Sequence, residues 1–414
     1  MRARRATRVL AGTMVSALAA TALTATAATA APSPGPDHDR HAAVRAVMDQ
    51  HVKEGIPGVL GRSEDHGATW KGSAGVADLS TGRKRTDRDR FRIGSVTKAF
   101  TSVVLLQLEA EGRLNLDDTV DRHLPGLVRG NGHDGTRITL RQLLNHTSGI
   151  YNYTADPELA AALTTGFPQH RYDVWKPGQL VGLAMRHQPD FAPGTGWNYS
   201  NTNYVLAGMV AEKVTGRSWA QEVRQRVLRP AGLRDTTLPG NSSAMPSPHG
   251  RAYSKLKFGP SGPSGPIQDT TELNPSWGWA AGEIISTTGD LNRFYSALVG
   301  GKLLPAKQQK ELLTAVPTGP GGESAGAAGY GLGLMRAKLS CGTSVWLHTG
   351  GIHGSSTLAA STDDGRHTTA FNLNGDWLGD LGALVEAEYC GTVPPAKGHT
   401  AQRSPSLEKL TALR

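Results

Sequence analysis

Three short motifs contain side chains that could perform covalent chemistry. The motif Ser95-Val96-Thr97-Lys98 places a hydroxyl nucleophile and an amine one helical turn apart. Tyr199-Ser200-Asn201 adds a phenol and an amide, and His348-Thr349-Gly350 adds an imidazole followed by glycine. A serine hydroxyl is a poor nucleophile until a neighbouring base accepts its proton. The three motifs in this order therefore predict a serine enzyme that transfers acyl groups.

The base in this set is either Lys98 or Tyr199. A free lysine has a pKa of about 10.4, which is too high for a base near neutral pH. Burial and a nearby positive charge would lower the pKa of Lys98, whereas Tyr199 needs a neighbouring ammonium to favour its phenolate. We therefore treat the two side chains as a pair that shares a proton. His348 could orient Tyr199 or carry a proton itself.

The remaining motif residues suit substrate binding. Asn201 can offer an amide N–H and C=O to a substrate amide, and the adjacent Gly350 and Gly351 allow a substrate to approach the backbone closely. The backbone N–H groups of Ser95 and Gly351 are expected to form an oxyanion hole. Taken singly, such residues also occur as helix caps or core side chains. Their combination favours the active-site interpretation.

Hydrophobic periodicity predicts the elements that hold these motifs. Ser95 opens a helix that is apolar almost all round and ends at Gly112, which indicates a central buried helix. Further helices are expected at about 38–54, 140–145, 177–187, 201–215, 219–228, 290–299 and 378–389. Strands are expected at 58–62, 69–77, 85–93, 330–338, 344–349, 355–361 and 368–374. The low-complexity segment 259–266 is expected to be a loop.

These elements predict an α+β fold. The first and last thirds of the chain supply an antiparallel sheet flanked by helices, and the middle third supplies a mainly helical lobe. One domain over residues 31–392 would then have two lobes, one from 38–112 with 281–392 and one from 113–280. The motifs come from both lobes, which predicts an active site in the cleft between them.

The N-terminus has the features of a secretory signal peptide. Residues 1–30 contain four arginines near the start, then an uncharged Ala-rich run, then the small-residue cleavage pattern Ala28-Thr29-Ala30. A membrane anchor is the alternative, but the run is rich in Ala and Thr. Loss of four arginines and no acid would lower the net charge from +9 to +5. We expect a secreted protein with no membrane attachment after cleavage and a disordered tail at 393–414.

The other bulk features exclude several functions. Lysines and arginines are scattered without an aromatic array, so nucleic-acid binding is not expected. Histidines show no paired helical spacing, so no metal and no cofactor are expected. Export and an even count favour a Cys341–Cys390 disulfide over two buried free thiols. We expect a monomer.

The motifs resemble those of the serine beta-lactamase and penicillin-binding superfamily. The similarity is greatest to the group with Tyr-x-Asn and His-Thr-Gly motifs, which includes class C beta-lactamases, D-aminopeptidases, family VIII esterases and secreted actinomycete D-alanyl-D-alanine carboxypeptidases. The stretches that carry it are Phe91–Lys98 (FRIGSVTK), Leu144–Gly149 (LNHTSG), Tyr199–Asn203 (YSNTN), Tyr330–Leu334 (YGLGL) and Leu339–Gly342 (LSCG). The Cys341–Cys390 pair is also placed as in those carboxypeptidases.

The resemblance implies a beta-lactamase/transpeptidase-like fold and an acyl-enzyme on Ser95, formed with Lys98 and Tyr199. It implies substrate contacts from Asn201, Trp277, His348, Thr349 and Gly350. The implied activity is D-alanyl-D-alanine carboxypeptidase action on peptidoglycan stem peptides, with beta-lactams as acylating ligands. The alternatives are an esterase, a class C-like beta-lactamase or a D-aminopeptidase acting on small esters or amides, or a penicillin-binding protein that deacylates slowly.

Two positions depart from the carboxypeptidase pattern. Where those enzymes carry an arginine that holds the terminal carboxylate of the substrate, this sequence has Met335, and strand alternation would turn the adjacent Arg336 to the other face. Gly351 replaces a threonine. A buried carboxylate without a cationic partner is costly, so the departures bear on recognition of a free C-terminal D-alanine.

Overall fold

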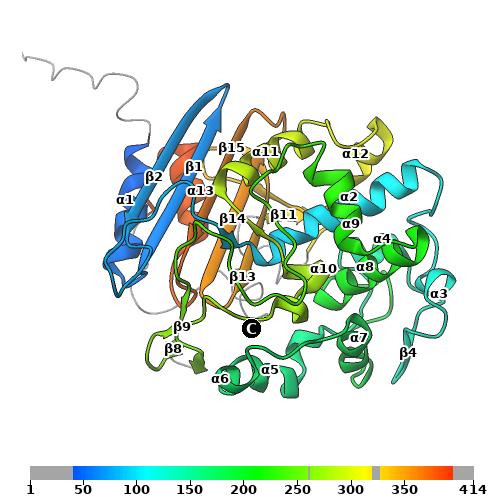
Figure 1. Cartoon of the computed structure of the whole chain (residues 1–414). Helices are drawn as coiled ribbons and strands as arrows, with labels where there is room; N and C mark the ends of the chain where they lie inside the picture. The colour runs from blue at the N-terminus through cyan, green and yellow to red at the C-terminus, as the bar shows by residue number, and fades with distance from the viewer. Residues whose placement is uncertain (1–40, 260–261, 319–326, 395–414) are drawn as a thin grey trace, which may run out of the picture.

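The computed structural model describes residues 41–259, 262–318 and 327–394 (Figure 1). The predicted signal peptide at 1–30 lies outside these ranges, as does the predicted tail from residue 395 onward. In the described part of the chain, no helix has the length and hydropathy needed to cross a bilayer.

A seven-stranded antiparallel sheet forms the centre of the molecule, in the order β11-β12-β13-β14-β15-β1-β2 (Figure 1). Strands from the two ends of the chain meet where β1 pairs with β15, with Val59 opposite Leu373. The strands are β1 (Gly58–Asp65), β2 (Ala68–Gly75), β11 (Ala327–Tyr330), β12 (Met335–Lys338), β13 (Ser344–Ile352), β14 (Ser355–Thr362) and β15 (His367–Leu373). The α+β fold with an antiparallel sheet flanked by helices is confirmed.

Helices cover both faces of this sheet (Figure 1). On one face α1 (Ala42–Lys53) packs beside α13 (Leu381–Cys390), and the two helices share an apolar core with the sheet. On the other face α11 (Thr288–Val299) packs on β14, β15 and β1. Next to it runs α2 (Thr97–Ala110), which is buried along nearly its whole length, as predicted. Gly112 follows α2 with a positive φ of 69° and ends the helix.

The middle of the chain is mostly helical and packs around α2 and α8. Its α-helices are α3 (Val120–His123), α4 (Leu140–Leu144), α5 (Pro157–Leu163), α6 (Phe167–His170), α7 (Pro177–Met185), α8 (Asn201–Thr215), α9 (Trp219–Val223) and α10 (Trp279–Gly282), with α12 (Ala306–Leu312) later in the chain. Short helices are the 3-10 turns η1 (Gly94–Val96), η2 (Tyr153–Ala155) and η4 (Pro275–Trp277) and the π-helical turn η3 (Arg224–Leu228).

Four two-stranded ribbons complete the described elements. They are β3 (Phe91–Arg92) with β10 (Ile285–Ser286), β4 (Arg129–Gly130) with β5 (His133–Asp134), β6 (Tyr253–Ser254) with β9 (Gln268–Asp269), and β7 (Lys257–Gly259) with β8 (Gly262–Ser264). The last ribbon falls largely in the segment 259–266, for which a loop was predicted. The β3–β10 ribbon connects directly to η1 and therefore to the first motif.

Two predicted strands are wrong in extent. Of the strand predicted at 85–93 only Phe91–Arg92 is extended, because Asp89 closes a turn and accepts hydrogen bonds from the N–H and hydroxyl of Thr86. The strand predicted at 330–338 is two strands, β11 and β12. The chain reverses between them, where the Gly331 N–H donates to the Leu334 carbonyl at 2.8 Å.

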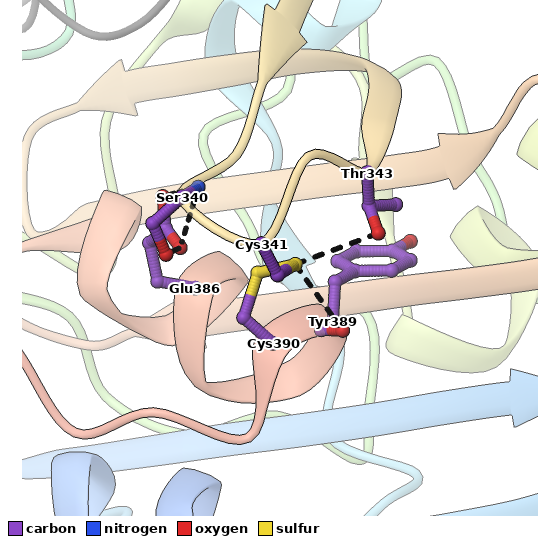
Figure 2. Close-up of a disulfide and its surroundings, with 6 residues drawn as sticks. All are labelled: Ser340, Cys341, Thr343, Glu386, Tyr389 and Cys390. Carbon is purple, nitrogen blue, oxygen red and sulfur yellow. Dashed lines mark hydrogen bonds between the residues drawn. A yellow bond between two sulfur atoms is a disulfide. The ribbon is translucent and has the colours of Figure 1, made fainter.

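The predicted disulfide is confirmed and joins the turn after β12 to the end of α13 (Figure 2). Cys341 and Cys390 are bonded with their Cα atoms 5.5 Å apart. Beside the bond, the backbone N–H and hydroxyl of Ser340 donate to the Glu386 carboxylate. The disulfide therefore fixes the β12–β13 turn at the end of the strand that carries the third motif.

Candidate active site

Ser95 lies in η1, which packs against the backbone of β13. This contact depends on glycine at 350, since a Cβ there would lie 1.9 Å from the Ile93 carbonyl oxygen and 2.9 Å from the Ser95 nitrogen. Gly94 has a φ of 50°, and a Cβ there would lie 2.8 Å from the Gly351 nitrogen. The glycines therefore bring the Ser95 and Gly351 backbone close together, as the predicted oxyanion hole requires.

The end of β13 next to Ser95 is an open strand edge. The pairing of β12 with β13 stops at Met335 opposite Leu347, while the pairing with β14 continues to Ile352. Gly351 is exposed, and a Cβ there would meet no atom within 4 Å. The half-buried Ser95 side chain thus lies beside a stretch of β13 that has free space for an extended substrate.

Lys98 is fully buried one turn after Ser95. Its Nζ atom lies 3.0 Å from the Ser95 Oγ, 2.7 Å from the Asn201 Oδ1 and 3.0 Å from the Ala281 carbonyl oxygen. Burial holds the pKa of Lys98 well below its usual value, which favours the neutral amine. The two carbonyl oxygens can only accept hydrogen bonds, so they take the two N–H groups. The nitrogen lone pair then faces the Ser95 hydroxyl.

Asn201 is the first residue of α8, and both polar atoms of its side-chain amide form hydrogen bonds. Its Oδ1 accepts from Lys98, and its Nδ2 donates to the Thr154 hydroxyl at 3.3 Å. Its backbone N–H donates to the Asn152 Oδ1 at 3.0 Å. In this arrangement the Asn201 side chain orients the Lys98 amine, whereas the sequence suggested an amide directed at substrate.

Tyr199 contributes a buried phenol with 4% of its surface exposed. Lys98 Nζ lies 4.7 Å from the centre of its ring. The phenol oxygen has no hydrogen-bond partner among the described residues, although Ser95 is close enough to lower its pKa in part. Burial is the larger effect and raises the pKa of Tyr199 well above the usual value. The free site therefore holds Tyr199 as a neutral phenol.

His348 lies on β13 and is fully buried. The Tyr330 hydroxyl donates to its Nε2 at 2.9 Å, and its Nδ1–H donates to the Thr349 carbonyl at 2.5 Å. Burial, reinforced by Lys98, lowers the pKa of His348 to about 3. The ring is therefore neutral at physiological pH. Its centre lies 6.2 Å from that of Tyr199 without a hydrogen bond between the two side chains.

His146 and Tyr330 also border the three motifs, and the sequence gave these two residues no role. His146 Nδ1 accepts from the Ser200 N–H at 3.1 Å and from the Asn203 Nδ2 at 3.2 Å, so its ring proton is on Nε2. Its ring lies 4.3 Å from the ring of Tyr199. Burial keeps the pKa of His146 well below its usual value. The signals were present in the LNHTSG and YGLGL stretches, but residue type alone did not reveal these contacts.

The remaining predicted substrate residues lie along β13 and its neighbours. Thr349 is buried on the strand itself, and Trp277 is half-buried in η4, where it packs near Ile352. The Trp277 ring lies 5.7 Å from that of His353. His353 in turn stacks on Phe167 at 4.4 Å and donates from Nε2 to the Leu163 carbonyl. These contacts direct the imidazole of His353 toward the helical part of the molecule.

Met335 lies beside Tyr199. It is buried in one cluster with Tyr199 and Tyr330. Arg336 points to the opposite face, as strand alternation predicted, where it lies 5.3 Å from the Trp346 ring centre and pairs with Asp363 at 3.0 Å. The side chain that faces Tyr199 from β12 is therefore an uncharged thioether.

No group of His, Cys, Asp and Glu side chains within the described ranges is arranged to hold a metal ion.

The chemistry available to the site follows from the arrangement of Ser95, Lys98 and Tyr199. A half-buried hydroxyl faces the lone pair of a desolvated amine, a neutral phenol lies next to both, and two backbone N–H groups lie beside an open strand edge. This set is suited to nucleophilic attack on a carbonyl carbon through a covalent intermediate.

Comparison with known proteins agrees with this chemistry. The family model described as Beta-lactamase matches residues 42–376. The chain therefore belongs to the beta-lactamase family, within the serine hydrolase superfamily that also includes penicillin-binding proteins.

The similar proteins include an amidohydrolase and an amidase of known structure, and a penicillin-binding protein. The structure of a D-stereospecific amidohydrolase from Streptomyces sp. has 54% identity and a TM-score of 0.80, covering 85% of this chain and 99% of that one. D-amino acid amidase from Ochrobactrum anthropi SV3, solved with L-phenylalanine amide, has 28% identity and a TM-score of 0.69, covering 81% of this chain and 91% of that one. Penicillin-binding protein 4* of Bacillus subtilis (strain 168) is 33% identical over 166 residues, which is 40% of this chain and 34% of that protein.

The match to the curated relatives is partial along their length. Penicillin-binding protein 4* is covered over 34% of its length and Protein flp of Staphylococcus aureus (strain MW2) over 48%. The chain thus spans about a third to a half of these relatives, whereas it spans nearly all of the Streptomyces amidohydrolase.

Proposed function

We propose that this protein hydrolyses amide bonds of D-configured amino acid or peptide substrates through an acyl-enzyme on Ser95. The observation that carries the proposal is the 3.0 Å contact between Ser95 Oγ and Lys98 Nζ, with the two lysine N–H groups directed at carbonyl oxygens. A serine next to a neutral buried amine is already arranged to lose its proton.

In the proposed reaction the Ser95 oxygen bonds to the substrate carbonyl carbon as its proton moves to Lys98. The N–H groups of Ser95 and Gly351 stabilise the oxyanion, and each such donor typically contributes roughly 2.7–4 kcal/mol. When the C–N bond breaks, the leaving amine takes a proton that passes from the Lys98 ammonium through the Tyr199 phenol. Water then attacks the ester carbon as one of its protons moves to Lys98. The bond between the acyl carbon and the Ser95 oxygen breaks, Ser95 takes the proton from Lys98, and the carboxylic acid leaves.

The substrate class follows from the surroundings of the nucleophile. A substrate with a free C-terminal carboxylate needs a cation beside it, and the β12 side chain next to Tyr199 is Met335. A neutral amide or a longer peptide chain fits an apolar wall better. The D-stereospecific amidohydrolase from Streptomyces sp., at 54% identity, supports the same choice.

The test is enantiomer-resolved turnover of amides with Ser95→Ala as the reference. D-phenylalanine amide and L-phenylalanine amide serve as probes, beside a peptide that ends in D-Ala-D-Ala. We expect D-amide hydrolysis to exceed both other rates by at least tenfold and to vanish in Ser95→Ala. Equal turnover of the two enantiomers, or a preference for the free carboxylate, would overturn the substrate class. Turnover that persists in Ser95→Ala would overturn the mechanism.

The D-alanyl-D-alanine carboxypeptidase activity is a second candidate, supported by the similarity to penicillin-binding protein 4*. Beta-lactams are proposed to acylate the same serine. Intact mass spectrometry after brief exposure to benzylpenicillin tests this point, with a single adduct expected in the wild type and none in Ser95→Ala. A stable adduct without amide turnover would instead favour a slowly deacylating penicillin-binding protein.

Export and a monomeric state are further parts of the proposal. The signal-peptide pattern in residues 1–30 supports export. Sequencing the N-terminus of protein recovered from culture medium tests it, and an uncleaved Met1 in the cell fraction would contradict it. Light scattering tests the monomeric state. An assembly of several chains would contradict it, as in the octameric penicillin-binding protein homologue from Pyrococcus abyssi, which has a similar fold.

A further inference from the structure

A small, partly open pocket lies beside the β3 strand that leads to Ser95. Its walls come from β3 and the segments before it, from the β13–β14 turn at Gly354, and from the chain before β6. Four arginines line it, namely Arg85, Arg90, Arg92 and Arg251. Such a concentration of cations around one cavity raises the question of which anion balances them.

Arg92 is deeply buried, with 3% of its surface exposed. Its Nη2 donates to the Ser243 carbonyl at 2.9 Å and to the Leu273 carbonyl at 3.0 Å. Its Nε and Nη1 atoms are buried and have no hydrogen-bond partner among the described residues. A buried guanidinium with unused N–H groups is energetically costly unless something else accepts from them.

The other arginines of the pocket have acidic partners. Arg90 pairs with Asp235 at 2.5 Å. Arg85 lies 3.9 Å from Asp89. Even so, the Nε atoms of Arg85 and Arg90 also lack a hydrogen-bond acceptor in the described part of the chain.

The charge of Arg251, which is half-exposed, is also neutralised by acidic partners. Arg251 pairs with Asp78 at 3.3 Å and with Asp269 at 2.5 Å. Arg251 therefore adds no unpaired charge to the pocket.

Arg92 differs because no carboxylate of the described residues forms an ion pair with it. Glu283 is the acid that acts on it electrostatically, from outside ion-pair distance. Burial raises the pKa of Glu283 to about 7, so this carboxyl group is partly protonated near neutral pH. Burial lowers the pKa of Arg92 only to about 10, so the guanidinium keeps its charge. The positive charge of Arg92 is thus left largely uncompensated.

We propose that this pocket binds a small inorganic anion of halide size, held by the Nε and Nη1 donors of Arg92 with help from Arg85 and Arg90. The pocket has free space for little more than one water-sized particle, which favours a small anion. Water is the competing occupant, because the Oδ1 atom of Asn374 also lines the pocket without a hydrogen-bond partner and could accept from it.

The bound anion would stabilise the strand that leads to the nucleophile. The Arg92 carbonyl accepts hydrogen bonds from the hydroxyls of Ser355 at 2.7 Å and Thr357 at 3.3 Å, which fastens β3 to β14. Ser95 follows three residues later. An anion bound to the Arg92 side chain would stabilise the same strand. We therefore expect it to raise the free energy of unfolding of the protein without contacting the substrate.

The experiment uses the wild-type protein in sodium gluconate, titrated with sodium chloride at constant ionic strength. We expect saturable broadening of the ³⁵Cl resonance and a rise in melting temperature. Crystals in sodium bromide should give an anomalous peak within hydrogen-bond distance of the Arg92 guanidinium. Arg92→Gln should weaken chloride binding at least tenfold, while Arg217→Gln, which removes an exposed arginine elsewhere, should leave it unchanged.

The diffraction arm keeps the test independent of whether Arg92→Gln folds. A pocket that contains water alone in bromide, together with the same melting temperature in gluconate and chloride, would overturn the proposal. Chloride binding that is unchanged in a folded Arg92→Gln variant would place the anion elsewhere and overturn it as well.

Discussion

Replacing Asn201 with aspartate tests which group takes the proton from Ser95. The variant puts a carboxylate where the amide oxygen now lies, 2.7 Å from the Lys98 Nζ. At an effective dielectric constant of about 20, this attraction for the ammonium is about 6 kcal/mol, equivalent to about 4 pKa units. Desolvation of the new carboxylate offsets part of it. We therefore expect the pKa of Lys98 to rise by at least about one unit.

The sign of the effect separates the two candidate bases. Burial lowers the pKa of Lys98, so the amine is neutral above that pKa and activity falls as the pH decreases through it. If Lys98 is the base, Asn201→Asp moves the acidic limb of the kcat/KM profile to higher pH. If the Tyr199 phenolate is the base, a more stable Lys98 ammonium favours the phenolate and moves the limb to lower pH.

The assay is hydrolysis of D-phenylalanine amide between pH 4 and 10. Asn131→Asp adds the same charge at an exposed site and serves as the control. An acidic limb that stays in place while activity falls, or that moves to lower pH, would refute the assignment of Lys98.

Three further predictions concern specificity and packing. Met335→Arg should increase turnover of a peptide ending in D-Ala-D-Ala at least tenfold over Met335→Leu, because it puts a cation beside Tyr199; equal kcat/KM values would contradict this. Gly350→Ala should cost about 1–3 kcal/mol in urea unfolding, since its Cβ would meet the Ile93 carbonyl at 1.9 Å, whereas Gly351→Ala should be almost neutral; equal losses would disprove the close contact. Replacing both cysteines by serine removes a cross-link between residues 49 positions apart and should lower the free energy of unfolding by up to about 4 kcal/mol. An unchanged denaturation midpoint would show that the disulfide does not stabilise the fold.

Local sequence determined much of the fold. The apolar run after Ser95 specified a buried α2, because a helix without a polar face must lie inside. Alternation along β12 correctly put Arg336 on the opposite face from Met335. The prediction failed at 85–93, where the Asp89 side chain competes for backbone hydrogen bonds, an interaction that hydrophobic periodicity does not register.

The sequence also placed the residues of the candidate site in their motifs, but only the tertiary structure decided their states. Whether Lys98 is neutral depends on its burial and on acceptors from Asn201 and Ala281, which are distant in the chain. The neutral form of His348 likewise depends on its burial, reinforced by Lys98 from a distant part of the chain. Residue type and spacing are properties of the chain, whereas a pKa is set by desolvation and by neighbours that folding brings together.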